Sequence, residues 1–239
     1  MLSGSEKYYD DIYGTMGKDY VAEATKIHEL IQTYKRTDGN TLLDVACGTG
    51  THAGLLREWY QVEGTDLNAD MLKVARNKHP GIRFTKSDMR SFDLGRQFDV
   101  VTCLFSAIGY MKTRTELQKA IKSMSRHLLA GGVLLVEPWF TKEQWKRGRV
   151  STILVDRPAM KIVRMTRGGI RGNISLLDFQ YLIGTARGIK HIVEHHEFGL
   201  FSEADYMDAF TKAGLPVIHD PEGVDGRGLY IGIKPPIKQ

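Results

Sequence analysis

The residues whose types and spacing most clearly suggest a functional site are two glycines and two acids in the first third of the chain. The apolar run 41–46 leads into residues 47–50, which read Cys-Gly-Thr-Gly. Glycines at such a point let the backbone turn tightly and let a ligand approach closer than a side chain would permit. Asp44 lies within the run, and Asp66 ends the next apolar segment, where an acid can accept hydrogen bonds from both hydroxyls of a ribose. These residues predict a site for a nucleoside-containing cofactor.

The glycine segment alone fits two cofactors, because residues 48–53 also match the G-x-G-x-x-G/A pattern of dinucleotide sites. Three features favour S-adenosylmethionine. The Asp44 carboxylate would repel a pyrophosphate but attract a cationic amino-acid group. Asp88 and Met89 follow the third expected strand, where the acid can accept from an adenine amino group and the methionine can pack on the ring. An amphipathic helix at 18–34 also precedes the first strand, whereas a dinucleotide domain usually begins with the strand.

The elements that must position these residues alternate between helix and strand from residue 20 to 137. Short connections between them predict a doubly wound parallel sheet with helices on both faces. The expected helices cover 18–34, the segment from Gly50 to about Trp59, 69–78 and the segment from Leu117 to Leu128, which Gly131 and Gly132 end; the expected strands cover 41–46, 62–66, 82–85, 98–104 and 132–137.

The pattern changes after Trp139. Strand-like segments at 151–156, 161–165, 173–183 and 191–198 are punctuated by glycines, Gly168-Gly169 among them, and predict an antiparallel insertion, or cap. Ser202 then begins a helix with Asp205 as its capping-box partner. Two last strands, 215–218 and 228–233, return to the core. We expect three parts: a cofactor-binding core at 1–140, a substrate cap at 141–200, and a segment at 201–239 that completes the core.

The D-V-A-C-G-T-G segment, the acid at Asp66 and the pair Asp88-Met89 resemble those of class I S-adenosylmethionine-dependent methyltransferases. The resemblance implies an α/β fold with a seven-stranded Rossmann-like sheet whose last strand is antiparallel. It places Asp66 at the ribose, and Asp88 and Met89 at the adenine. The residues it assigns elsewhere in the cofactor site are Asp44, Gly48 and Gly50 on the methionine side, Tyr20 near the carboxylate, and Ala46, Thr51, Leu67 and Phe105.

Further segments resemble the N,N-dimethyltransferases of TDP-linked amino-deoxysugars, which act in deoxysugar biosynthesis. They include 17–20, 88–96, 105–110, 136–139 and 226–229. The resemblance implies two methyl transfers to a sugar amine. Three positions depart from some members: Tyr110 where they carry His, Leu2 near a tyrosine of theirs, and Trp139-Phe140 in place of a tryptophan pair. Methylation of another small amine, such as an amino acid or polyamine, remains the alternative, and RNA methylation a more distant one.

Tyr110 is the candidate residue to contact the reacting amine of the substrate, because it follows the fourth strand at the edge where open α/β sheets bind ligands. Its ordinary pKa of about 10 makes it a poor base, so it is expected to orient the amine. His52 is an alternative base, expected in the first turn of the helix after the glycines.

By resemblance, the N-terminal segment with Tyr9 closes over the cofactor, while Tyr13 is expected to pack against the first helix. The expected substrate residues are Tyr9, Ser106, Glu137 and Trp139, of which the last two should line the acceptor pocket, and Arg227, flanked by glycines.

The net charge is +5, from 33 Lys and Arg against 28 Asp and Glu. It is concentrated at residues 142–171, which hold nine basic and two acidic residues. Such a cluster suits the diphosphate of a small substrate, and the chain lacks the binding module or aromatic-interleaved basic stripe of RNA enzymes. The chain has only two cysteines, no apolar run near 20 residues and no cluster of Cys or His at the spacing of metal ligands. We therefore expect a cytoplasmic protein without metal, membrane or nucleic-acid partners. A homodimer through the cap is a further hypothesis.

Overall fold

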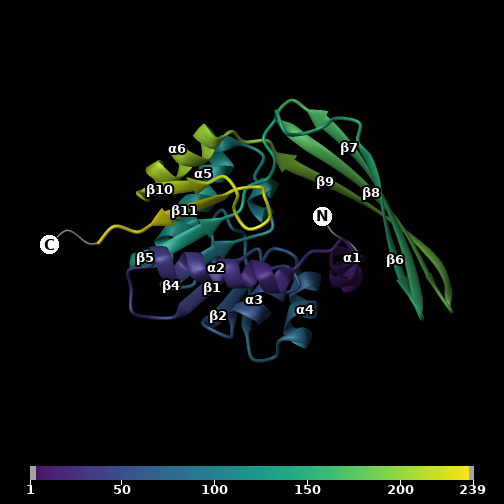
Figure 1. The fold of residues 1–239 in the computed structure, drawn as a ribbon, viewed down its shortest axis with the longest axis horizontal. Coiled ribbons are helices and arrows are strands. Elements are labelled where there is room, and N and C mark those ends of the chain that lie inside the picture. Colours follow the sequence, from purple (N-terminus) through teal and green to yellow (C-terminus); the bar gives the residue numbers. More distant parts are fainter. Residues whose placement is uncertain (1–3, 237–239) are drawn as a thin grey trace.

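The structure, a computed structural model, describes residues 4–236, so Leu2 lies outside the described part. Within it the strands form two sheets, one of seven and one of four strands (Figure 1). The helical segments are η1 (Glu6–Tyr8), α1 (Tyr9–Thr15), α2 (Tyr20–Tyr34), α3 (Thr51–Leu56), α4 (Ala69–Lys78), η2 (Ala107–Tyr110), α5 (Arg114–Arg126) and α6 (Glu203–Lys212). The strands are β1 (Thr41–Val45), β2 (Gln61–Asp66), β3 (Arg83–Lys86), β4 (Phe98–Cys103), β5 (Leu128–Val136), β6 (Val150–Arg157), β7 (Met160–Arg171), β8 (Ile174–Thr185), β9 (Gly188–Gly199), β10 (Val217–Asp220) and β11 (Leu229–Ile233).

The core sheet has the strand order β10-β11-β5-β4-β1-β2-β3. Strands β1 to β5 pair in parallel, whereas β11 is antiparallel to both β5 and β10. The expected doubly wound, seven-stranded fold is confirmed. The chain order reverses between β1 and β4, and the carboxyl ends of strands at such a point are where open α/β sheets bind ligands.

Helices cover both faces of this sheet because successive strand residues point to opposite sides. Leu42 and Val100 pack with α2, α3 and α4, while Leu43 and Val101 pack with α5 and α6. Helix α2 buries Ile27 and other residues of one face, and α6 begins with the capping box expected at Ser202 and Asp205.

The end of α5 differs from the expectation. The helix ends at Arg126, and Leu128 already pairs with Phe98 as part of β5. Residues between Leu128 and Val133 form an irregularity in the strand, where Gly131 adopts a φ of +83°. Arg36 N donates to the carbonyl of Gly131 at 2.8 Å. Apolar periodicity alone did not show this boundary, because a buried helix end and a buried strand start look alike in sequence.

The four-stranded cap sheet has the order β6-β7-β8-β9 with antiparallel pairing throughout. Strand β7 runs straight through Gly168 and Gly169, which the sequence suggested as a turn. The ring of Trp145 lies against Gly168, and Trp145 Nε1 donates to the carbonyl of Gly169 at 2.7 Å. These glycines therefore make room for an indole, and the turn comes at Gly172, with a φ of +63°.

Helix α1 lies between the cap and the core (Figure 1). Ile12 is buried against Val155, Ile162 and other apolar side chains of the cap's inner face. On the core side, Asp10 accepts hydrogen bonds from Thr49 and Thr51 of the glycine segment at 2.7 and 3.0 Å. The N-terminal segment thus joins the two sheets.

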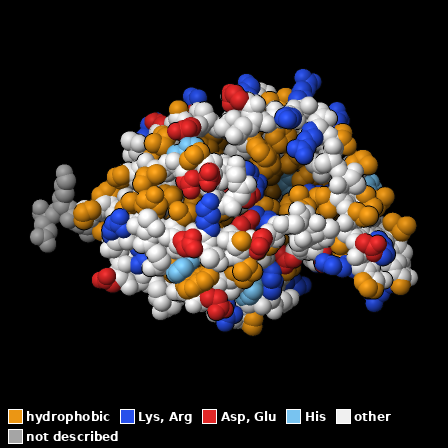
Figure 2. Space-filling model, viewed as in Figure 1, with side chains coloured by type: hydrophobic (Ala, Val, Ile, Leu, Met, Phe, Trp, Pro, Cys, Tyr) orange, Lys and Arg blue, Asp and Glu red, His pale blue; other side chains and the backbone are white. Residues whose placement is uncertain are grey.

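None of the helices in the described range 4–236 combines the length and the apolar character needed to cross a bilayer. Figure 2 shows the surface hollowed where the cap meets the core, with hydrophobic and Lys or Arg side chains along its margin.

Candidate functional site

A cavity of about 1350 Å³ lies between the carboxyl edge of the core sheet, helix α1 and the inner face of the cap. Single-ligand pockets usually measure about 300–1,000 Å³, so this cavity has room for a cofactor and a second molecule. The expected site residues that line it are Tyr9, Tyr20, Asp44, Ala46, Gly48, Thr51, Asp66, Leu67, Asp88, Met89, Phe105, Tyr110, Trp139 and Arg227. Gly50, Ser106 and Glu137 lie behind the cavity wall instead.

The two glycines have different roles. Gly48 has a φ of +56° and open space where a Cβ would be, so a ligand can approach its backbone. Gly50 has a φ of +74°, and a Cβ there would lie 3.0 Å from the ring of Phe84. Gly50 therefore permits close packing of the loop on β3, while Gly48 leaves the loop backbone accessible to a ligand.

Asp66 holds this loop in place. Its Oδ2 accepts from Gly48 N at 2.9 Å, and its Oδ1 accepts from Asn68 N at 2.8 Å. Burial raises the pKa of Asp66, although these backbone donors oppose the rise. Each carboxylate oxygen has a second lone pair, so the side chain that faces the cavity can also accept from ribose hydroxyls.

Asp44 is the buried acid of the site, with 2% of its surface exposed. Thr102 Oγ1 donates to its Oδ1 at 3.0 Å. Burial raises the pKa of Asp44 to about 6, even though the nearby His52 and the Thr102 hydrogen bond act in the opposite direction. A buried acid with one hydrogen bond suits a cationic partner, such as the ammonium group of an amino acid.

We expect cofactor binding to depend on this acid. The carboxylate form attracts the ammonium group, and the protonated form, which dominates below about pH 6, does not. The dissociation constant of S-adenosylhomocysteine should therefore rise about tenfold per pH unit below pH 6 and level off above pH 7. Calorimetric titration between pH 5 and 8 measures it.

Asp44→Asn is the matched control, because its side-chain oxygen still accepts from Thr102. Its affinity should be about 10–100-fold lower at pH 7.5 and independent of pH. An equal pH dependence in both proteins would assign the titration to another group.

Two buried hydroxyl groups in the cavity wall support a polar ligand. Tyr20 Oη and Ser87 Oγ have no hydrogen-bond partner within residues 4–236, and both residues line the cavity. Because buried polar groups are nearly always satisfied, these two are expected to bond to a bound molecule. Tyr20 is expected at the methionine side and Ser87 lies beside Asp88, which is expected at the adenine. The donor set therefore fits S-adenosylmethionine.

Asp88, the residue expected at the adenine, is bonded to Arg90 through both carboxylate oxygens, at 2.6–3.0 Å. Hydrogen bonds from the Arg90 side chain keep the pKa of Asp88 below its usual value. Asp88 is therefore an acceptor at neutral pH, as recognition of an adenine amino group requires. Met89 is half-buried next to it.

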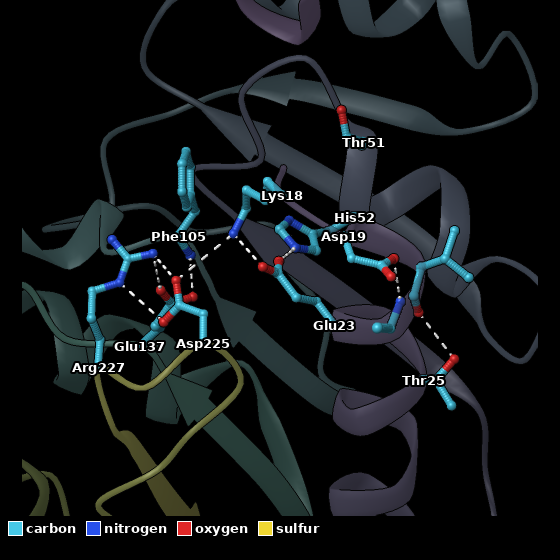
Figure 3. Close-up of polar contacts among 12 residues, drawn as sticks. Lys18, Asp19, Glu23, Thr25, Thr51, His52, Phe105, Glu137, Asp225 and Arg227 are labelled. Atoms are coloured by element: carbon cyan, nitrogen blue, oxygen red, sulfur yellow. Dashed lines mark hydrogen bonds and ion pairs between the residues drawn. The ribbon is translucent and has the colours of Figure 1, made fainter. Parts of the chain in front are cut away.

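Beneath Phe105, Glu137 and Arg227, which were both expected to contact the substrate, form an ion pair with each other (Figure 3). Glu137 is fully buried and its Oε2 accepts from Phe105 N at 2.7 Å. Its Oε1 lies 3.2 Å from Arg227 Nη2, an ion-pair contact without hydrogen-bond alignment. Arg227 also donates to Asp225, and its guanidinium lies 5.4 Å from the Phe105 ring. These charges are paired with one another, and they hold the strained Phe105, with a φ of +52°, in place.

A second polar network joins Lys18 and Glu23 to His52, close to the glycine segment. Glu23 Oε2 lies 2.9 Å from His52 Nε2, and Lys18 donates to Glu23 Oε1 (Figure 3). Burial tends to raise the pKa of Glu23, but the bonds from His52 and Lys18 outweigh it and lower the pKa. His52 lies in the first turn of α3, as expected, and its partner is an acid of α2. Lys18 and Glu23, which the sequence analysis did not assign to the site, both line the cavity.

Aromatic rings form the wall on the acceptor side. Tyr9 and Tyr13 are 4.5 Å apart between ring centroids, and Tyr13 lies 4.9 Å from Phe105, so Tyr13 contributes to the wall as well as to packing. The Trp139 ring stacks on Phe198 at 4.6 Å, and Trp139 Nε1 donates to Ser175 Oγ at 2.9 Å.

Ser106 is buried behind this wall. Its Oγ donates to the carbonyl of Pro138 at 2.6 Å, which ties the end of β4 to the segment after β5. A hydroxyl committed to the backbone in this way supports the shape of the wall from behind.

Three of the nine basic residues at 142–171 line the cavity, namely Lys146, Arg149 and Arg164. Lys146 and Arg149 are exposed, and Trp145 lines the same cavity. Arg164 is only 5% exposed and lies over the rings of Tyr13 and Phe179, 5.2 and 4.7 Å from their centroids. The cap therefore brings positive charge and flat apolar surface to one side of the cavity.

The cap also contributes buried polar residues that the sequence did not single out. Tyr110 Oη lies 2.9 Å from His196 Nδ1, and His196 Nε2 lies 3.3 Å from Glu194 Oε2. Both cap residues are nearly inaccessible. The alternation of β9 could have shown them, because Glu194 and His196 fall on the same face as the apolar Ile192.

No group of three or more His, Cys, Asp or Glu side chains among residues 4–236 is arranged to hold a metal ion.

Residues 42–132 match the model of a family described as a methyltransferase domain. Two curated relatives extend the likeness to nearly the whole chain. The dTDP-3-amino-3,4,6-trideoxy-alpha-D-glucopyranose N,N-dimethyltransferase of Streptomyces venezuelae is 39% identical over 94% of this chain and 95% of its own. The dTDP-4-amino-2,3,4,6-tetradeoxy-D-glucose N,N-dimethyltransferase of Saccharopolyspora spinosa is 34% identical over 95% of this chain and 91% of its own.

Solved structures share the cap as well as the core. The crystal structure of DesVI from Streptomyces venezuelae superimposes with a TM-score of 0.92 at 37% identity, over 99% of this chain and 100% of that one. The amino pentose methyltransferase CalS10 from Micromonospora echinaspora, solved with S-adenosylmethionine bound, gives a TM-score of 0.85 at 36% identity, over 95% and 96% of the two chains.

Proposed function

Because the chain belongs to the family of S-adenosylmethionine-dependent N,N-dimethyltransferases of nucleotide-linked amino sugars, we propose that it methylates the amine of a TDP-linked amino-deoxysugar twice. One observation carries the proposal. A single cavity joins the glycine loop and its acids to a cap wall with aromatic rings and basic side chains. A small amine such as an amino acid or polyamine would not need the aromatic and basic side chains of the cap wall.

The reaction is an in-line displacement. S-adenosylmethionine supplies a methyl group on a positively charged sulfur, and the sugar amine supplies the lone pair. The protein must therefore align the amine, exclude water and keep the amine unprotonated. In this proposal Asp44, Tyr20 and the Gly48 backbone hold the methionine end, Asp66 the ribose, and Asp88 and Met89 the adenine. Tyr110 contacts the reacting amine, and Tyr9 and Trp139 enclose the sugar.

We place the diphosphate at Lys146 and Arg149. Arg227 is the weaker candidate, because its guanidinium is already bonded to Asp225 and paired with Glu137. Lys146 and Arg149 are exposed, line the cavity and have the nearby Trp145 ring as a surface for the nucleobase. A guanidinium matches two phosphate oxygens at once, which suits the Arg149 side chain to a diphosphate.

Removing these charges should weaken substrate binding alone. Lys146→Ala and Arg149→Ala are each expected to raise KM for the nucleotide sugar about tenfold or more, because a charged hydrogen bond contributes about 1.5–3 kcal/mol. The turnover number and the affinity for S-adenosylhomocysteine should stay within twofold. Arg147→Ala is the matched control, since Arg147 lies between the two on the chain and does not line the cavity. An equal effect of all three would indicate a loss of general positive charge.

Mass spectrometry of products tests the reaction itself. Purified protein, S-adenosylmethionine and a TDP-3-amino-3,6-dideoxyhexose should yield first a singly and then a doubly methylated sugar. The 4-amino isomer is included because the two curated relatives differ in the position of the amine. Turnover of an amino acid or polyamine with no methylation of either sugar would favour the alternative substrate class.

We further propose that the chain acts in the cytoplasm as a homodimer and does not bind nucleic acid. Cys47 and Cys103 are both free, which suits a reducing compartment. The outer face of the cap exposes Leu154, Met165 and Leu182 at 49–58%, an apolar surface that a second copy could cover. Light scattering gives the oligomeric state, and a monomer at micromolar concentration would contradict the dimer. A mobility shift of RNA by the protein at 150 mM salt would contradict the proposal that the chain does not bind nucleic acid.

A further inference from the structure

A line of hydrogen-bonded polar side chains runs from the cavity into the inner face of the cap. Tyr110 lines the cavity and is 39% exposed. Its Oη lies 2.9 Å from Nδ1 of His196, whose Nε2 lies 3.3 Å from Oε2 of Glu194. Tyr181 Oη donates to the same Glu194 oxygen at 3.2 Å. His196 is 3% and Glu194 1% exposed, so Tyr110 is the most exposed member of the line, although His196 and Tyr181 also border the cavity.

In the neutral imidazole, the chemistry of the partners determines which nitrogen of His196 carries the hydrogen. A carboxylate can only accept, so the Nε2 that faces Glu194 is the N–H donor. Nδ1 is then left with a free lone pair and accepts the hydroxyl hydrogen of Tyr110. In this arrangement a neutral imidazole can take up one proton at Nδ1, and the Glu194 carboxylate would stabilise the resulting cation.

The reaction proposed above, on which this inference rests, requires a proton acceptor twice. A sugar amine arrives largely protonated at neutral pH, and the first methyl transfer leaves a secondary ammonium that must lose a proton before the second. Although 39% of the Tyr110 surface is exposed, its surroundings, mainly through burial, raise its pKa above the ordinary value. Tyrosinate is therefore not available as the base, and the proton must continue to another group.

We propose that Tyr110, His196 and Glu194 form a relay that deprotonates the substrate ammonium before each methyl transfer. The ammonium N–H bond breaks as its proton passes to Tyr110 Oη, and the hydroxyl proton of Tyr110 passes at the same time to His196 Nδ1. The amine gains a lone pair, Tyr110 stays neutral, and His196 becomes an imidazolium that later releases its proton to water. Tyr110 is the catalytic residue that touches the amine, and His196 and Glu194 act through it.

The surroundings of His196 are compatible with this cycle. Its ring stacks at 6.1 Å on Phe198 and lies 4.8 Å from Phe179, so apolar rings flank the imidazole. The ionisable groups on elements around it are Tyr110 of η2, Tyr13 of α1, Arg164 of β7, Tyr181 of β8 and Glu194 of β9 itself. Arg164 is the one fixed cation in this set, and Glu194 the one acid.

The pH dependence of turnover tests the relay. His196→Asn retains a side-chain oxygen near the position of Nδ1, which can accept from Tyr110 but cannot carry the proton away. We expect kcat to fall about 10²–10³-fold at pH 7, the usual contribution of a general base, with KM and cofactor affinity within threefold. The deficit should shrink to less than about tenfold at pH 9, where more of the substrate arrives as free amine. Tyr110→Phe should behave in the same way.

His195→Asn is the matched control, because the neighbouring histidine lies on the opposite, exposed face of β9 and pairs with Asp178. It should leave kcat unchanged at every pH. A deficit in His196→Asn that is constant from pH 6.5 to 9 would show a purely structural role and overturn the relay, as would full activity at pH 7.

Nitrogen-15 NMR of the histidine side chains separates the relay from the identity of the substrate. With S-adenosylhomocysteine bound at pH 7.5, His196 should be neutral with hydrogen on Nε2, and its Nδ1 signal should shift in Tyr110→Phe. Hydrogen on Nδ1 would overturn the relay whether or not the sugar is methylated. If the tautomer is as expected but no TDP-amino sugar reacts, the proposed substrate fails, and the pH comparison is made with whichever amine is methylated.

Discussion

Replacing Asp66 with alanine is expected to weaken binding of S-adenosylhomocysteine at least about 100-fold. The side chain accepts from Gly48 N at 2.9 Å and from Asn68 N at 2.8 Å while it faces the cavity. Alanine removes the proposed acceptor for the ribose and also the hydrogen bond that shapes the loop at Gly48, where we place the methionine end. Hydrogen bonds to a charged group contribute about 1.5–3 kcal/mol each, so the loss of two accounts for the magnitude. Calorimetric titration at pH 7.5 measures it.

Two further variants show whether the loss is specific. Asp66→Asn keeps one carbonyl acceptor for the loop and should retain more affinity than alanine, with a loss of about tenfold. Asp70→Ala removes an exposed acid in the first turn of α4 and should change the dissociation constant less than twofold. A change below threefold in Asp66→Ala would contradict the assignment of the ribose to this residue.

Glu137→Ala is expected to lower the free energy of unfolding by about 3 kcal/mol. Glu137 is fully buried, accepts from Phe105 N at 2.7 Å and lies 3.2 Å from the Arg227 guanidinium. Alanine leaves a buried N–H without an acceptor and removes one of the two acids that pair with Arg227. Breaking a buried ion pair from one side costs about 3–5 kcal/mol, and the remaining Asp225 keeps the loss at the lower end. Urea unfolding followed by circular dichroism measures it.

The same variant should also lose cofactor affinity, because Phe105 would no longer be held at a φ of +52° against the cavity. Glu137→Gln retains an oxygen for Phe105 N and should cost only about 1 kcal/mol. Glu143→Ala, at an exposed glutamate six positions later, should leave stability within about 0.5 kcal/mol. If alanine and glutamine at position 137 were equally destabilising, the charge rather than the Phe105 bond would be the main contribution.

The cofactor half could be predicted well because its determinants are local. The glycine segment, the preceding strand and the following helix lie within about 20 residues, so spacing alone indicated a strand, a turn with close ligand access and a helix. The structure brings Asp44, Gly48 and Asp66 to one cavity edge as that spacing implied. Gly50 is the exception, since its packing against Phe84 depends on a strand more than 30 residues away.

The substrate half could be predicted only in outline. Alternating residues indicated four antiparallel strands at nearly the right places, but not that β7 runs through two glycines to make room for Trp145. The sequence did not indicate helix α1. Its Ile12 packs against apolar side chains of the cap, and its Asp10 accepts a hydrogen bond from Thr49 of the glycine loop. A seven-residue helix is too short to show a periodic pattern of its own.

By itself, the sequence determined the doubly wound core, the cofactor and the presence of a cap, because each follows from short-range patterns of glycines, acids and apolar residues. Only the tertiary structure decided which polar groups are available to a ligand. Arg227 looks accessible between two glycines, yet pairing with Glu137 and Asp225 commits its charge to the fold. His196 looks like one of several histidines on a strand, yet the packing of β9 against η2 places it behind Tyr110. Pairing and burial depend on residues distant in sequence, and no local pattern records them.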